Sequence, residues 1–117
     1  MDVKWPDRRG DVLNGLDTLA EEPPRLAGDE PDPRWPDVTN AIHWVLDDTW
    51  WDQRDPREDI GDLLRDEREA EAVERVVRAI VTVAGRQAGR SDAHWFGDPD
   101  WPRVRDLAAH AAVMLRA

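Results

Sequence analysis

The chain has 117 residues and contains no cysteine, no tyrosine, one phenylalanine and a single lysine. Because cysteine is absent, disulfide bonds, thiolate metal sites and cysteine nucleophiles are excluded. No apolar run is long enough for a signal peptide or a membrane-spanning helix. We therefore expect a cytoplasmic protein without a membrane partner.

Residues that serve the commonest catalytic sites are also scarce. Ser91 is the only serine, and it lies outside the Gly-x-Ser-x-Gly context of a hydrolase nucleophile. His43, His94 and His110 are separated by long gaps that do not match the ligand spacing of a zinc site. We expect no catalytic residue and no cofactor, and a binding protein is favoured over an enzyme.

Acidic residues are abundant and unevenly distributed. The formal net charge is -10, and residues 47–74 contain twelve acids and four arginines, whereas residues 75–90 contain four arginines and no acid. Binding to a nucleic-acid backbone requires a broad basic surface, so nucleic acid is not an expected partner. An acidic surface suits a basic protein partner, since opposite potentials speed encounter. The alternative is an acidic face that only keeps the protein soluble.

Apolar residues recur with the helical period along most of the chain, which predicts an all-α fold. Residues 1–117 are expected to form a single compact domain. Residues 21–37 contain five prolines, which exclude a helix interior and favour a loop between the first two helices. We expect about five helices, over residues 6–20, 38–50, 56–65, 66 to Gly85 or Gly89, and 102–116.

Two helix starts have capping residues. Asp55 precedes Pro56, and Glu58 follows at the third helical position, which together predict the start of the third helix. Asp66 and Glu69 repeat the spacing before a broad apolar stripe. We expect this fourth helix to be the buried centre of the domain.

The sequence contains seven tryptophans, and two are adjacent. Trp50 and Trp51 follow Asp47 and Asp48 and precede Asp52. Neighbouring side chains on a helix diverge by about 100 degrees, so at least one of the two rings should reach the surface. An exposed tryptophan among carboxylates is typical of a binding hot spot for an arginine-bearing partner. These five residues are the candidate partner-binding site; alternatively, one ring seals the core and the other covers the Pro-rich loop.

The same acids allow a different hypothesis. Asp47 and Asp48 could join Glu71 and Glu74 in a magnesium site, as in helical phosphohydrolases that act on nucleotides. The spacing of the aspartates is not that of the usual metal motif, and a solvated acidic face is the simpler interpretation. We therefore expect no metal, and we keep the magnesium-dependent phosphohydrolase as an alternative.

One succession of short motifs runs through the chain: Asp47-Asp48-Thr49, Asp55-Pro56, Ile60-Gly61, Leu63-Leu64, Glu69, Asp98-Pro99 and Trp101. In this succession, over residues 41–112, the chain resembles a family of small, uncharacterised, acidic actinobacterial proteins. Fifteen arginines against one lysine indicate a GC-rich genome, which agrees with such a source. These proteins are similar to the immunity proteins of bacterial toxin systems, so the resemblance implies an immunity- or antitoxin-like inhibitor of a basic partner. A structural or regulatory homodimer joined through exposed tryptophan is a further alternative.

Overall fold

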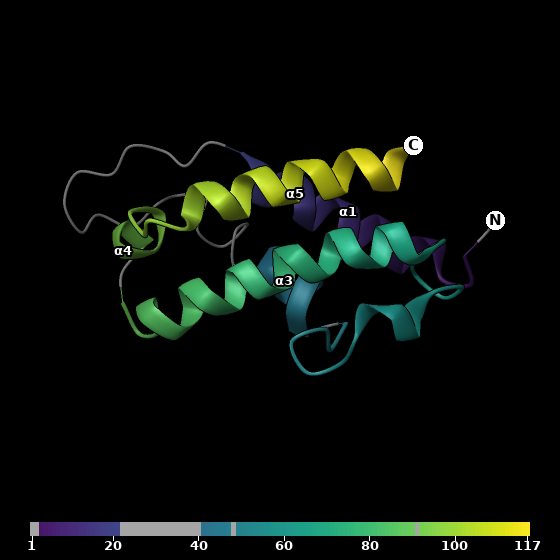
Figure 1. Cartoon of the computed structure of the whole chain (residues 1–117), viewed down its shortest axis with the longest axis horizontal. Coiled ribbons are helices and arrows are strands. Elements are labelled where there is room, and N and C mark those ends of the chain that lie inside the picture. Colours follow the sequence, from purple (N-terminus) through teal and green to yellow (C-terminus); the bar gives the residue numbers. More distant parts are fainter. Residues whose placement is uncertain (1–2, 22–40, 48, 91) are drawn as a thin grey trace.

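The computed structural model describes residues 3–21, 41–47, 49–90 and 92–117, and over these residues the fold is helical, without strands (Figure 1). The predicted all-α single domain is confirmed. None of the helices within these ranges is long and apolar enough to cross a membrane. In chain order the elements are α1 (Pro6–Ala20), η1 (His43–Asp47), η2 (Pro56–Asp59), α3 (Glu67–Gln87), α4 (Asp92–Phe96) and α5 (Trp101–Arg116).

Helix α1 has the predicted bounds, with Pro6 in its first turn, where no backbone N–H donor is needed. Its buried side chains are spaced to form one face. Gly15 lies on this face, and a Cβ atom there would be 3.1 Å from the carbonyl oxygen of Ala41 and 3.1 Å from Val45. Glycine at this position therefore allows η1 to approach α1 closely.

Helix α3 is the long buried helix that the apolar stripe predicts. The side chain of Asp66 accepts a hydrogen bond from the backbone N–H of Glu69 at 3.0 Å, as expected for the cap. The helix continues through Gly85 and ends at Gln87, and Gly89 then adopts a positive φ of 77°. Gly89 is thus the glycine that follows the helix end.

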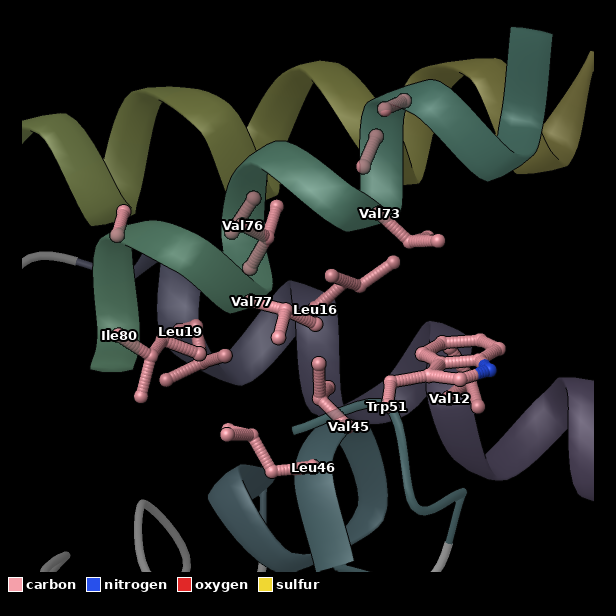
Figure 2. Close-up of a cluster of buried hydrophobic side chains, with 14 of the residues drawn as sticks. Val12, Leu16, Leu19, Val45, Leu46, Trp51, Val73, Val76, Val77 and Ile80 are labelled. Atoms are coloured by element: carbon pink, nitrogen blue, oxygen red, sulfur yellow. The ribbon is translucent and has the colours of Figure 1, made fainter. Parts of the chain in front are cut away.

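The core lies where α1, η1 and α3 meet, and α5 packs against both long helices (Figures 1 and 2). Figure 2 shows aliphatic side chains from all three elements directed toward one another, with the ring of Trp51 at one side of the cluster. The labelled members are Val12, Leu16, Leu19, Val45, Leu46, Trp51, Val73, Val76, Val77 and Ile80.

A buried carboxylate ties three helices together. The side chain of Glu69 is 2% exposed and accepts hydrogen bonds from Arg9 at 2.7 and 2.9 Å and from Arg65 at 2.7 Å. Arg9 also donates to the carbonyl oxygen of Leu115, near the end of α5, at 2.7 Å. Burial by itself raises the pKa of Glu69, but the hydrogen bonds from Arg9 and Arg65 outweigh it, so the pKa lies below its ordinary value. We call these residues the Glu69 cluster.

The predicted helix over residues 56–65 is wrong. Asp55 caps as expected, accepting from the backbone N–H of Arg57 at 2.9 Å, but only the short 3-10 turn η2 follows. The chain then leaves the helical path, because Ile60 is extended and Gly61 has a φ of 95°, which no right-handed helix accommodates. In the predicted helix 38–50, η1 has π-helical geometry, and residues 38–40 lie outside the described residues.

Candidate functional site

The candidate site lies on the segment that follows η1 and runs to η2 (Figure 1). Thr49 is buried, and its hydroxyl donates to the carbonyl oxygen of Val45 at 2.7 Å. The hydroxyl oxygen of Thr49 in turn accepts a hydrogen bond from the backbone N–H of Trp51 at 3.3 Å. These bonds terminate η1 and turn the chain. The side chains of the two adjacent tryptophans in this turn therefore lie in different environments.

Trp50 is the exposed member of the pair. Its side chain is 60% exposed, and its backbone has a φ of 64°, in the left-handed region. Its carbonyl oxygen accepts from the backbone N–H groups of Gln53 at 2.9 Å and Arg54 at 2.8 Å, which closes the turn. For a bulky residue this conformation costs about 1–3 kcal/mol, whereas glycine adopts it without steric conflict. The backbone conformation at position 50 is therefore energetically unfavourable for the tryptophan that occupies it.

Trp51 belongs to the core, so it is not the exposed ring of the pair. The residue is only 3% exposed, with its ring beside the aliphatic cluster (Figure 2). Its indole N–H donates to the Asp59 carboxylate at 2.7 Å. A ring that is almost completely buried and has a satisfied N–H group cannot be the exposed anchor of the site, although Trp51 contributes to the lining of the groove beside it. The prediction that at least one ring of the pair reaches the surface is confirmed, by Trp50.

Asp59 organises the segment, and the sequence analysis did not identify it. Its buried carboxylate accepts from the indole of Trp51 and from the guanidinium of Arg54, and its carbonyl oxygen accepts three backbone N–H groups from residues 62–64. The hydrogen bond that Arg54 donates to Asp59 raises the pKa of Arg54 above its ordinary value. Asp59 is one of twelve acids in an acidic stretch, and no spacing or motif in the sequence distinguishes it from the other eleven.

Arg57 fastens the segment to α3. Its guanidinium bonds to the carboxylate of Glu74, to Asp55 at 3.2 Å and to Glu67 at 3.4 Å. These bonds, the one to Glu74 above all, hold the pKa of Arg57 above its ordinary value. The other carboxylate oxygen of Glu74 pairs with Arg78 at 2.6 Å. Arg57 is therefore engaged in the fold, whereas Arg78 is 78% exposed.

A groove of about 550 Å³ lies between this segment and α3. Its apolar part includes the exposed side chain of Val81 beside the buried Val77, and its other side includes Asp52. Asp52 itself is exposed, and among the described residues it forms no ion pair. We call this the loop–α3 groove. Trp50 is not part of its lining but comes directly before it in the sequence. The lining comprises Trp51, Asp52, Gln53, Arg54, Asp55, Pro56, Glu74, Val77, Arg78, Val81 and Thr82.

The structure places two of the four acids of the alternative metal site. Glu71 pairs with Arg75 at 2.7 Å, and Glu74 is held between two arginines, so both carboxylates already have cationic partners. The side chain of Asp47 and the whole of Asp48 lie outside the described residues. Within the ranges that the structure covers, no group of three or more His, Asp or Glu side chains could hold a metal ion. The four-acid site therefore stays a prediction.

One family model matches the chain. Its description is "Domain of unknown function (DUF7945)", and the match covers residues 3–117. The match therefore extends to the N-terminal region, which lies outside residues 41–112 where the sequence motifs of the resemblance occur. No curated protein and no solved structure matches the chain.

Proposed function

The chain belongs to the DUF7945 family, and we propose that it acts by binding a basic protein partner through Trp50 and the carboxylates near it. We further propose that it does so as an immunity- or antitoxin-like inhibitor, which occludes its partner. The observation that carries the proposal is the exposure of Trp50 in a strained backbone conformation.

Tryptophan at position 50 is unfavourable for the isolated protein in two ways. The left-handed backbone disfavours any bulky side chain, and exposure of a large apolar ring forgoes the free energy of burial. Glycine or asparagine would form the same turn more easily. Backbone strain of this kind is concentrated at functional sites, and tryptophan is enriched at the energetic centres of protein interfaces. A partner that buries the ring would recover the lost burial energy.

The charges around Trp50 indicate the chemistry of the partner. Asp52 and Glu58 are exposed and have no ion pair within the described part of the chain. The nearby Arg54 and Arg57 form their ion pairs with other carboxylates, chiefly those of Asp59 and Glu74. The surface beside Trp50 thus presents carboxylates to solvent, and it suits a partner with arginine or lysine beside an apolar pocket.

The test compares baits that differ at one exposed residue. The wild-type protein and the variants Trp50→Gly and Val113→Ser are immobilised and exposed to lysate of the source organism, and captured proteins are identified, purified and measured individually by calorimetry. Val113, on α5, is the matched control because it is 68% exposed and also apolar. Glycine is chosen at position 50 because it keeps the turn.

We expect a basic protein that binds the wild type and Val113→Ser equally and loses at least about 2 kcal/mol of binding free energy with Trp50→Gly. An inhibitor must also abolish an activity of that protein at equimolar ratio. Capture that is unaffected by Trp50→Gly would contradict the proposal. A wild-type dimer that Trp50→Gly converts to a monomer would instead support the homodimer.

A further inference from the structure

A second charged surface lies on the other flank of α3, along its seam with α5. Two neighbouring hollows of about 350 and 250 Å³ occupy this seam, and Arg75 lines both. Arg78 and Thr82 line the first hollow and also the loop–α3 groove, so they form the ridge between the two surfaces. We call the two hollows together the α3–α5 seam. They are lined by Arg75, Arg78, Ala79, Thr82, Asp100 and Arg103, and by Arg68, Glu71, Ala72, Arg75, His110 and Met114.

The seam has the shape of a binding site for an extended chain. Helices α3 and α5 lie side by side and run in opposite directions (Figure 1), and the hollows follow one another along them. Arg103 lines one hollow and Met114 the other, and at 1.5 Å per helical residue these positions are about 16 Å apart along α5. A peptide of about five extended residues covers that length.

The cations of the seam are only weakly neutralised. Arg68 and Arg103 form no ion pair with any residue that the structure describes. Arg75 and Arg78 pair with Glu71 and Glu74 one turn away, but all of these side chains except Glu74 are more than half exposed, and such pairs contribute little to stability. They can therefore be exchanged for a ligand without disturbing the fold.

The one other acid at the seam does not compete for these arginines. The carboxylate of Asp100 is bound by Arg86, which also holds Asp98 at 2.7 Å. Ala72 and Ala79 contribute small apolar surface between the arginines. The seam therefore combines guanidinium groups at its edges with an uncharged strip that lets a backbone approach.

We propose that the α3–α5 seam binds a short, extended, acidic segment of a protein. A guanidinium group binds a carboxylate through two parallel hydrogen bonds. Four arginines line the seam, and each can bind one carboxylate. Nucleic acid fits less well, because a long polyanion would meet the net charge of -10 of the chain, whereas a short segment meets only the local arginines. This surface is independent of Trp50.

The probe is a six-residue peptide of alternating glutamate and alanine, acetylated and amidated at its ends. It is titrated into the full-length, ¹⁵N-labelled protein at low salt, and binding is followed by amide chemical shifts. The same peptide with lysine in place of glutamate tests the sign of the charge. The variants are Arg75→Glu and Arg103→Glu, and Arg90→Glu is the control, since Arg90 is exposed beyond the end of α3 and the change in net charge is the same.

We expect shifts that map to residues 68–82 and 100–114, which line the two hollows. The affinity should fall at least about tenfold, equivalent to ~1.4 kcal/mol, in Arg75→Glu and Arg103→Glu but not in Arg90→Glu. The lysine peptide should not bind, and Trp50→Gly should bind the glutamate peptide normally. The spectra themselves show whether each variant is folded, and Arg103→Gln replaces Arg103→Glu if that variant unfolds.

Four results would overturn the inference. They are no binding at millimolar peptide, equal losses in the control variant, stronger binding of hexathymidylate than of the peptide, and salt-sensitive self-association of the protein that the seam variants abolish. The third would assign the seam to nucleic acid and the fourth to a second copy of this chain. None of these results bears on the partner of Trp50, so the two proposals can fail separately.

Discussion

The Glu69 cluster and the segment around Asp59 both contain a buried carboxylate, but the two carboxylates connect different parts of the molecule. Each is built on a buried carboxylate that accepts hydrogen bonds from arginine. At Glu69 the donors come from separate parts of the chain, and Arg9 also reaches the end of α5, so the cluster joins helices. At Asp59 the donors lie within eight residues, so the carboxylate shapes only its own segment. The first arrangement supports the whole fold, and the second positions a strained, exposed tryptophan.

The largest expected effect is from Glu69→Gln. The substitution keeps the shape of the side chain but removes the charge that Arg9 and Arg65 share, and breaking a buried ion pair costs about 3 kcal/mol. Urea denaturation followed by circular dichroism measures the loss. Glu71→Gln is the control, because its half-exposed pair with Arg75 should contribute less than about 0.5 kcal/mol. Equal effects of the two substitutions would show that the cluster does not hold the helices together.

Asp59→Ala should destabilise the protein less, by about 1–3 kcal/mol, because it leaves the buried indole N–H of Trp51 without an acceptor. The loss should be local, so the urea midpoint falls while amide exchange quickens mainly in residues 49–64. Glu58→Ala is the control, because Glu58 is an exposed neighbour that pairs with no residue in the described part of the chain. A global loss as large as that of Glu69→Gln would remove the distinction between the two carboxylates.

Acid should affect the Glu69 cluster through the lowered pKa of its carboxylate. The ordinary value is 4.5 and the folded-state pKa lies below it, so the unfolded chain binds the proton more readily. The stabilisation is therefore complete above about pH 5 and is lost as the pH falls through 4.5 toward the folded-state pKa. Urea midpoints measured from pH 6 to pH 3 should fall less steeply for Glu69→Gln than for the wild type. Parallel profiles would contradict this assignment.

The sequence predicted the regular parts of the fold better than the candidate site. Helix α1, the Asp66 cap and α5 follow from local periodicity and capping, which a single helix determines by itself. The segment 56–65 has equally good local signals at Asp55 and Pro56 but departs from the helix at Gly61. Its path goes with the bonds of Asp59 to Trp51 and Arg54, eight and five residues before it, and neither helical periodicity nor a capping motif specifies these bonds.

The same limit applies to the adjacent tryptophans. The sequence analysis expected Trp50 and Trp51 to diverge because it continued a helix to residue 50, and it kept both rings as candidates for the exposed one. In the structure they diverge because they lie in the turn that follows η1. The choice between them is made by the left-handed turn at Trp50 and by the buried acceptor that Asp59 offers to Trp51. Exposure of one ring was predictable, whereas its identity was not.

Trp50→Gly should raise the stability slightly, by about 1 kcal/mol. Release of the backbone strain contributes about 1–3 kcal/mol, and the greater freedom of glycine in the unfolded chain removes about 1 kcal/mol of that gain. Thermal unfolding by calorimetry measures the difference. Asp52→Gly is the control, because Asp52 is nearby and its φ is not positive. This substitution should lower the stability, so it separates the effect of the left-handed turn from the general effect of introducing glycine. Destabilisation by Trp50→Gly would mean that the ring supports the fold, which would weaken the case for a binding role.

The smallest expected effect is that of magnesium, for which we predict no specific change in melting temperature. A ligand that binds only the folded protein stabilises it by about 2.7 kcal/mol at one hundred times its Kd, so millimolar magnesium would reveal a preorganised site of micromolar affinity. Glu71 and Glu74 already have arginine partners, which a metal ion would first have to displace. Because a chain with a net charge of -10 also responds to ionic strength, sodium chloride at matched ionic strength is the necessary control. Stabilisation by magnesium beyond that control, and its loss in Asp48→Asn, would favour the phosphohydrolase over the binding protein.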